Sequence, residues 1–454
     1  MMKISKFAVR IAIFGMSCLV VGVIMPVVPA AFGQALPAAE AAPISTGFAL
    51  PTTLGSLQYA VSASQSLIWG YYGNSGEVSA TNLSGDVAYL SNSKLHPFSM
   101  IFSGGRSFSE AGQESYSYLN LAFSQVANVG RWNFIVSDTV SYLPGTPSAG
   151  LSGVPGVGDL GINPVQVGGD TGQGVLTDYS NRVSNAAAGS VSRQITGKTS
   201  LNASGSYSIM RFLGDSLTSP SANSGGLDSD SATGGAGIRH EVDSRNSFGG
   251  NYSYANYSYT GNSFGVPEPG FVSQTISAFF AHQFTRKLSF SAAAGPQWTT
   301  ISNSGSGSIY GSGAALSLFA DVSASYIGKS TTTSLVFTRS TNSGYGSTGG
   351  GISNSVVLGA NRRVATVWNL SASSTYTQTS SLPIAGVPSY LVNTYVEGVQ
   401  ISRAFARSFS GFASYTVEDQ HYSGSSAVNI FSGLEQVVGF GVTYSPAAFH
   451  LGRQ

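Results

Sequence analysis

The sequence predicts an all-β fold, a closed antiparallel up-and-down transmembrane β-barrel of about 18 strands. Three observations predict it. Only 9% of the 454 residues are charged, against roughly 25% in a typical soluble domain. Apolar and polar residues alternate with period two over most of the chain, as strands with two different faces require. The charged residues and tryptophans collect near the ends of these alternating stretches.

The low charge also excludes several classes of protein. A soluble chain of this length needs a charged surface to stay dispersed, so a charge-poor surface indicates that something other than water covers much of it. Nucleic acid is not an expected partner, because binding phosphates requires a basic patch and the formal net charge is only +1. Intrinsic disorder fits poorly, because aromatic residues make up 11% of the chain.

Residues 1–35 are expected to form a cleaved secretory signal. A basic segment from Lys3 to Arg10 precedes an apolar run from Ile11 to Val28, and small residues that suit cleavage follow. The alternative is a transmembrane anchor, since the apolar run approaches ~18 residues; Pro26 and Pro29 favour cleavage. Cleavage would remove the single cysteine and three basic residues, which leaves 18 basic and 20 acidic residues and no disulfide chemistry.

The remaining chain is expected to be one barrel. Residues 36–56 form a short periplasmic linker, too short for a plug domain, residues 57–445 form the barrel, and residues 446–454 form a C-terminal tail. Within the barrel, Leu288, Phe290 and Trp298 share one face of a stretch whose other face is mostly small and polar. The expected strands are 57–71, 81–91, 97–107, 114–126, 131–143, 183–195, 198–212, 229–241, 246–260, 270–284, 287–301, 312–327, 330–341, 350–361, 365–379, 389–404, 408–420 and 432–445.

Two irregularities interrupt this pattern. The apolar phase changes between Tyr118 and Leu119, which favours a bulge there. Asp138 shares a face with Trp132 and Phe134, so that either the register slips or a contact between subunits covers it. Losing or merging one hairpin would reduce the count to the alternative of 16 strands.

Charged residues divide between the two kinds of connection. Ten basic residues lie at or beside tight turns: Lys94, Arg131, Lys198, Arg245, Arg286, Lys287, Lys329, Arg362, Arg363 and Arg407. Many acids lie in or beside the long connections, including Glu77, Glu110, Asp215, Asp228 and Glu268. Trp69 and Trp298 are expected near the long-loop rim, and Trp132 and Trp368 near the tight-turn rim. Two aromatic girdles that flank an apolar band are typical of a transmembrane β-barrel.

Lipid would cover the outward face of such a barrel, and closure would remove the sheet edges. The alternative fold is a soluble Ser/Gly-rich β-solenoid or adhesin stalk, which would show a shorter repeat. The leader, the alternating long and short connections and the outward apolar face resemble bacterial outer-membrane β-barrel proteins of the porin-like class, over nearly the whole chain. One departure is the C-terminus: many such barrels end on an aromatic residue, whereas here Tyr444 and Phe449 are displaced candidates.

The longest connection, residues 144–182, is a candidate constriction. By the same resemblance, a loop in this position folds into the lumen of trimeric porins, which implies that Asp159, Asp170, Asp178 and Arg182 line a narrowing. The alternative is a surface cap with no role in permeation. A glycine spacing at Gly156-x-Gly158-x-x-Gly161 matches a dinucleotide motif only formally, because no strand and helix flank it; no cofactor is expected.

The inward face is expected to be mostly small and polar, and barrels of ~16–18 strands of this kind hold an aqueous channel. The alternation of residue types predicts the lumen-facing charges Arg239, Glu241, Asp321, Glu397, Glu418 and Glu435. Of these, Asp321 and Glu397 lie near mid-strand, whereas rim solvation is the alternative for the others.

Catalysis and metal binding find little support. A barrel hydrolase needs a histidine within hydrogen-bond reach of a serine or carboxylate, and His421 beside Glu418 and Asp419 is the nearest approach. No His/Cys cluster indicates a metal. We therefore expect a non-enzymatic channel in the bacterial outer membrane that admits small hydrophilic solutes by passive diffusion, with lipid around it and a homo-oligomer allowed. The alternative is a non-conducting barrel with a structural, adhesive or surface-interaction role.

Overall fold

The computed structural model describes most of the barrel segment. The described residues are 55–70, 77–93, 95–109, 115–143, 181–213, 228–260, 262–263, 266–267, 270–301, 313–343, 350–382, 389–424 and 432–451. The predicted leader, the linker up to residue 54 and residues 144–180 of the long connection lie outside them. Within the described residues, no helix is long and apolar enough to cross a membrane.

Within the described residues the fold comprises eighteen long strands and three short ones. The first half comprises β1 (Gly55–Trp69), β2 (Val78–Ser91), β3 (Phe98–Ser109), β4 (Tyr116–Val129), β5 (Trp132–Leu143), β6 (Asn181–Gln194), β7 (Thr199–Leu213), β8 (Asp228–Glu241) and β9 (Asn246–Thr260). A short hairpin of β10 (Asn262–Ser263) and β11 (Val266–Pro267) follows. The second half comprises β12 (Phe271–Gln283), β13 (Leu288–Ile301), β14 (Ala314–Ile327), β15 (Thr331–Asn342), β16 (Gly351–Arg363), β17 (Trp368–Ser381), β18 (Tyr390–Ala404), β19 (Phe409–Gly424), β20 (Gly433–Tyr444) and β21 (Phe449–Leu451).

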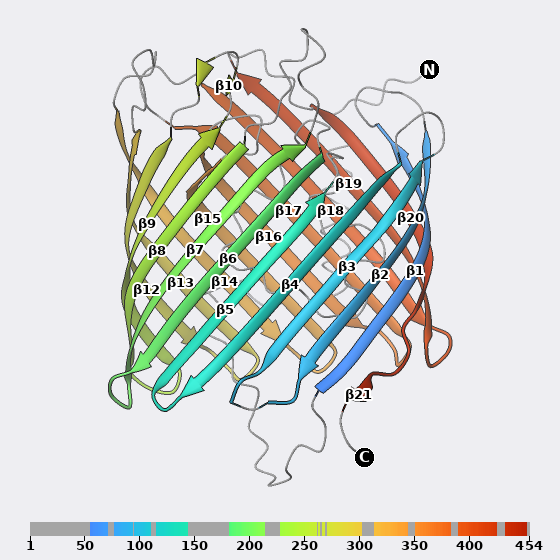
Figure 1. Ribbon diagram of the computed structural model, residues 1–454, viewed down its shortest axis with the longest axis horizontal. Helices are drawn as coiled ribbons and strands as arrows, with labels where there is room; N and C mark the ends of the chain where they lie inside the picture. The colour runs from blue at the N-terminus through green and yellow to red at the C-terminus, as the bar shows by residue number, and fades with distance from the viewer. Residues whose placement is uncertain are drawn as a thin grey trace.

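The long strands form one closed antiparallel sheet. Each pairs with its sequence neighbours, β9 pairs with β12, and β1 closes the barrel by pairing with both β2 and β20. Figure 1 shows the strands as a tilted wall, with β10 at one end, here called the loop end, and the tight turns at the other, the turn end. The predicted up-and-down barrel is confirmed with 18 strands, and the bounds differ from the predicted ones by at most four residues.

The chain after β20 returns to the barrel wall. Beyond Tyr444 and an interruption at Pro446, β21 pairs with the first residues of β1. The rings of Tyr444 and Phe449 both lie against Tyr59, with centroid distances of 6.3 and 6.1 Å. Part of the predicted tail is therefore a strand, and both candidate aromatic residues pack at the closure of the barrel.

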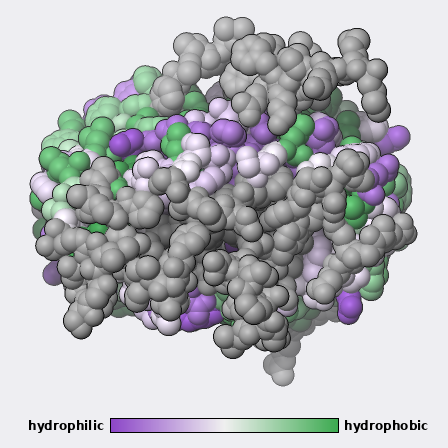
Figure 2. Space-filling model, turned by 90° about the horizontal axis from the view of Figure 1, so that it is seen from above, coloured by the Kyte–Doolittle hydropathy of each residue, from purple (hydrophilic) through white to green (hydrophobic). Residues whose placement is uncertain are grey.

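The two faces of the wall reverse the arrangement of a soluble protein. Apolar side chains such as Val61, Leu318 and Phe440 are more than half exposed, whereas their neighbours of opposite parity, such as Ser62 and Thr443, are almost fully buried. Seen from above, hydrophobic side chains gather at the left and right margins of the molecule and hydrophilic ones lie along its rim (Figure 2). Because residues opposite each other on paired strands share a face, the register divides every strand into outward and inward residues.

The register also corrects one irregularity. β3 and β4 pair without interruption, from Phe98 opposite Gln125 to Ser107 opposite Tyr116, so no bulge lies between Tyr118 and Leu119. Tyr118 belongs to the inward set and is buried, and Leu119 belongs to the outward set and is exposed. A large aromatic residue on the inward face had produced the apparent change of phase.

Short polar side chains close several turns at the turn end. Thr196 Oγ1 accepts hydrogen bonds from the backbone N–H groups of Lys198 and Thr199. Thr285 Oγ1 accepts in the same way from the N–H groups of Lys287 and Leu288. Asp243 Oδ1 accepts from the N–H groups of Arg245 and Asn246 at 2.7 and 2.9 Å. Such side chains mimic a backbone turn, so the local sequence fixes where each hairpin reverses.

Candidate functional site

The inward face of the barrel is the candidate site. Its walls carry hydroxyl and amide groups that hydrogen-bond between strands. Ser62 lies 2.7 Å from Thr443 across β1 and β20, and Thr394 donates to Gln420 at 3.0 Å across β18 and β19. Asn82 donates to Ser66 at 3.0 Å in the same way. The lumen wall is therefore polar but mostly neutral.

Asp321 occupies the middle of the inward face, as predicted. It lies opposite Ala293 of β13 and Thr338 of β15, and its neighbours Leu318 and Ala320 alternate with it along β14. The outward exposure of Leu318 fixes this assignment. The carboxylate is thus a charge at about half the length of the strand, with small side chains on both sides.

Arg239 and Glu241 face inward near the turn end. They flank His240, which lies on the outward face, with its Nδ1 2.9 Å from Thr199 Oγ1. Glu241 lies opposite the buried Ser247 of β9. Both predicted residues therefore point into the lumen, at one end of it.

Glu418 and Glu435 lie directly opposite each other on β19 and β20. Both face inward, and only 3% and 2% of their surfaces are exposed. Val396 of β18 is the other neighbour of Glu418. This position places two acidic side chains together on the lumen wall toward the loop end, and two carboxylates on one cross-strand pair repel.

The register places Glu397 on the outward face, contrary to the expectation from the sequence. Glu397 lies opposite Ser374 and Val417, and it shares its face with the exposed Tyr395 and Ile401. The parity of β18 is clear only once its partners are known, because small and polar residues occur on both of its faces. Glu397 is therefore not a lumen determinant.

Of the four constriction candidates, the described residues include only Arg182. It is the second residue of β6, lies opposite Leu143 and Phe212, and belongs to the inward set at the loop end. Asp159, Asp170 and Asp178 lie outside the described residues, as does almost all of the connection itself.

Asp86 is an inward charge that sequence reasoning missed. It lies on β2 between Ala60 and Ser103 of the neighbouring strands and is 2% exposed. The sequence does contain the signal that identifies Asp86 as inward: Ser84, Asp86 and Ala88 alternate with the exposed Leu83 and Val87. Together with Asp321 and the two glutamates, it gives the described lumen an acidic bias.

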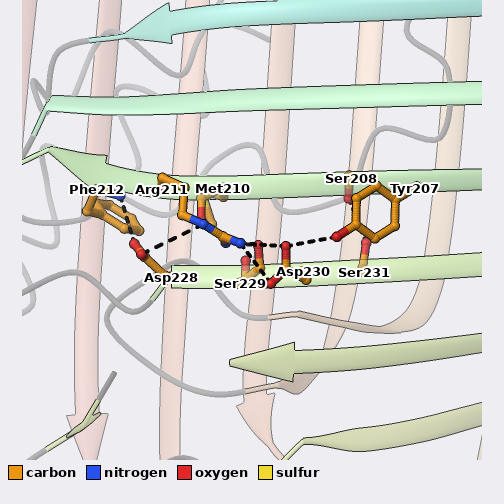
Figure 3. Close-up of polar contacts among 9 residues, drawn as sticks. All are labelled: Tyr207, Ser208, Met210, Arg211, Phe212, Asp228, Ser229, Asp230 and Ser231. Atoms are coloured by element: carbon orange, nitrogen blue, oxygen red, sulfur yellow. Dashed lines mark hydrogen bonds and ion pairs between the residues drawn. The ribbon is translucent and has the colours of Figure 1, made fainter. Parts of the chain in front are cut away.

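Polar groups also occur on the outward face. Asp138 lies on this face without any slip of register and accepts a hydrogen bond of 2.5 Å from Asn185 of β6. Nearer the loop end, Arg211 bridges two acids of β8: it donates to both carboxylate oxygens of Asp230 at 2.7 and 2.9 Å and approaches Asp228 at 3.9 Å (Figure 3). Tyr207 adds a hydrogen bond of 3.2 Å to Asp230.

The four tryptophans lie at or near strand ends on the outward face. Trp69 ends β1 and Trp298 lies three residues before the end of β13, both toward the loop end, whereas Trp132 and Trp368 begin β5 and β17 at the turn end. The guanidinium groups of Arg193 and Arg403 stack over Trp132 and Trp368 at 4.8 and 5.1 Å from the ring centroids. Basic and aromatic side chains thus share the turn-end rim.

The described residues contain no group of three or more His, Cys, Asp or Glu side chains that could hold a metal ion. His421, the histidine that the sequence places nearest to carboxylates, lies on the other side of the barrel wall from Glu418. His421 lies on the outward face of β19 and Glu418 on the inward face.

Similarities to known proteins are confined to solved structures. No protein-family model matches the chain, and no curated protein matches its sequence. Among solved structures, OccK2 (OpdF) of Pseudomonas aeruginosa in complex with glucuronate is 10% identical, with a TM-score of 0.42 over 86% of this chain and 98% of that one. OpdQ of the same species is 8% identical, with a TM-score of 0.38 over 87% and 99%.

A protein of a different kind matches comparably. The ferric-catecholate import receptor Fiu of E. coli K12, in its open form, is 11% identical, with a TM-score of 0.38 over 85% of this chain and 81% of that one.

Proposed function

We propose that this protein is a channel in the bacterial outer membrane through which small hydrophilic solutes diffuse passively. The observation that carries the proposal is the reversed distribution of polarity on a closed barrel of 18 strands. Apolar side chains are exposed on the outside, where lipid would cover them, and hydroxyl and amide groups face inward. Barrels of this size enclose an aqueous space rather than a packed core.

The outer-membrane location rests on the barrel itself and on the predicted leader. A closed sheet leaves no unpaired edge in lipid, so strands can span a bilayer only in this form. The outward tryptophans at both ends suit the two membrane interfaces, and an N-terminal secretory signal would direct the chain to the envelope. We assign it no enzymatic activity and no cofactor.

A homo-oligomer is part of the proposal. Asp138 and Asn185 form a polar pair in the middle of an outward wall that would otherwise meet hydrocarbon. Charged groups at the centre of a bilayer are costly on the lipid face of a barrel. Contact with a second copy would remove this pair from lipid.

Planar-bilayer recording tests the channel. Purified, folded protein should insert with discrete current steps in simple salt, because its lumen is polar. The matched control is the same preparation after heat unfolding, which should give no steps. Absence of steps from folded protein would contradict the channel and favour the alternative, a non-conducting barrel with a structural or surface-interaction role.

A further inference from the structure

The wall between β14 and β15 is incomplete toward the loop end. β15 pairs with β14 only from Ala320 opposite Arg339 to Ile327 opposite Thr332. On its other side, β14 pairs with β13 as far as Ala314. In the described register, the last part of β15 instead pairs with β16 alone, as far as Asn342 opposite Gly351. The two strands therefore separate above Ala320.

β15 moves inside the barrel after this separation. Thr341 Oγ1 donates to Gln297 Oε1 at 3.0 Å and lies 3.4 Å from Thr299 Oγ1, and both partners belong to the inward face of β13. Two residues after Thr341, the carbonyl oxygen of Ser343 accepts a hydrogen bond of 2.6 Å from the hydroxyl of Tyr259 on β9. Neither β13 nor β9 is a ladder neighbour of β15.

The beginning of β16 follows the same path. Ile352 packs in a buried cluster with Tyr257, Phe271 and Ile301, which face inward from β9, β12 and β13. The rings of Tyr257 and Phe271 stack at 4.5 Å, and Phe271 is 1% exposed. At Gly350 a Cβ atom would collide with the Phe271 ring, so only glycine fits this close approach.

The wall thus overlaps itself. In the alternation along their strands, Thr341 and Ile352 fall on the same face as the outward-facing Arg339 and Asn354. They nevertheless contact inward-facing residues of other strands. The inner tip, as we call the end of β15 (Ser340–Ser343) together with the beginning of β16 (Gly350–Ile352), therefore lies inside the wall formed by β12 and β13.

Two sequence features accompany the overlap. Gly295 and Pro296 interrupt the ladder between β12 and β13, which is unpaired between Thr275 opposite Gln297 and Ala278 opposite Ala294. Proline has no N–H to donate, so it marks an irregularity in a sheet. At the separation point, Arg339 Nε donates to the Leu318 carbonyl at 3.1 Å and thereby satisfies one acceptor on the open edge of β14.

We propose that the inner tip is the element that narrows the channel, and that it selects solutes by size. This rests on the proposed channel function. The tip projects from the wall into the loop-end mouth and is held there by Gln297, Tyr257 and Tyr259. Its own lumen side carries the neutral residues Ser340 and Asn342, so it restricts the cross-section of the channel without imposing a charge preference.

The first experiment releases the tip. Tyr259→Phe removes the hydrogen bond to Ser343, and Gln297→Leu removes the acceptor for Thr341. The double variant should show a larger unitary conductance in planar bilayers, with an unchanged ratio of cation to anion permeability. Tyr252→Phe is the matched control, because the Tyr252 hydroxyl donates a hydrogen bond to Gln274 on the outward face of β9 and β12. Its conductance should equal that of the unaltered protein.

The second experiment locks the tip. In the released variant, Thr299→Cys with Thr341→Cys places two thiols where the hydroxyls are 3.4 Å apart. Oxidation should cross-link them and return the conductance to that of the unaltered protein, and reduction should raise it again. Ser206→Cys with Thr233→Cys, a pair on adjacent strands β7 and β8, should cross-link without any effect on conductance.

The outcomes separate the two proposals. Equal conductance of the unaltered, released and locked proteins would overturn the role of the tip while the channel function stood. Absence of current from all of them would overturn both. Failure of the cysteines at 299 and 341 to cross-link, when those at 206 and 233 do, would overturn the overlap itself.

Discussion

Glu418 and Glu435 face each other across β19 and β20 on the inward side of the barrel, both nearly inaccessible to solvent. Val396 and Val437 lie beside the pair on the same inward face. Acidic groups directly opposite each other destabilise a strand pair when both are charged, so we expect this pair to limit the stability of the β19–β20 ladder.

Asp321→Asn should lower the cation-to-anion permeability ratio of the proposed channel, because Asp321 faces inward near mid-strand and is partly exposed. One charge at ~4 Å in water is worth about 1 kcal/mol, so the cation-to-anion permeability ratio should fall by up to about fivefold. The measurement is the reversal potential in a salt gradient. Glu397→Gln is the matched control, because Glu397 faces outward, and it should leave the ratio unchanged. An equal effect of both substitutions would contradict the assignment of the two faces.

Gly105→Ala should destabilise the barrel. Gly105 faces inward, and a Cβ atom there would lie 2.7 Å from Cζ of Tyr118 and 2.5 Å from the Leu83 carbonyl. Overpacking of this kind typically costs about 1–3 kcal/mol. The temperature at which the folded form is lost on a heat-modifiability gel should fall. Gly189→Ala, where the nearest atom is 3.9 Å away, should not lower it, and a similar loss in both variants would contradict the packing explanation.

Ala187→Trp should break the proposed homo-oligomer. Ala187 lies opposite Asp138 on the outward face, so a large side chain there would hold a second copy away from the polar pair. Native electrophoresis or sedimentation in mild detergent should show a loss of oligomer. Ala372→Trp, on the outward face of β17, should leave the oligomer intact. Loss of the oligomer in both variants, or in neither of them, would contradict a subunit contact at Ala187.

Asp243 should make the turn between β8 and β9 sensitive to acid. Hydrogen bonds from the Asn246 side chain and from the backbone N–H of Arg245 lower the pKa of the Asp243 carboxyl below its ordinary value. A carboxyl whose folded pKa is lowered contributes stability above its unfolded pKa of about 3.9, and this contribution is lost as the pH falls through the folded pKa.

Asp243→Asn should therefore unfold at a lower temperature than the unaltered protein at neutral pH and match it in acid below both pKa values. The substitution keeps an acceptor for the turn but removes the charge. The comparison is the melting temperature of each protein over a pH series. A difference that persists unchanged in acid would mean that geometry, and not ionisation, accounts for the effect.

Much of the architecture could be predicted because a barrel wall is a local pattern repeated. Alternation over 287–301 and 246–260 predicted strands whose bounds the structure confirms almost residue for residue. Asp321 could be placed in the lumen for the same reason, since leucine and valine alternate clearly with small polar residues around it. Glu397 could not, because small and polar residues occur on both faces of β18 and only pairing with β17 and β19 resolves the parity.

The sequence by itself determined the antiparallel up-and-down strand pattern, a count of about 18 strands with 16 as the alternative, and the neutral polar character of most inward positions, because strand periodicity and turn chemistry depend on neighbours a few residues apart. Tertiary structure alone decided three further features: the opposition of Glu418 and Glu435, the outward position of Glu397 and the overlap that brings Thr341 onto Thr299. Each depends on how strands distant in sequence pair or fail to pair. Register and closure are properties of the whole sheet, and no window of the chain contains them.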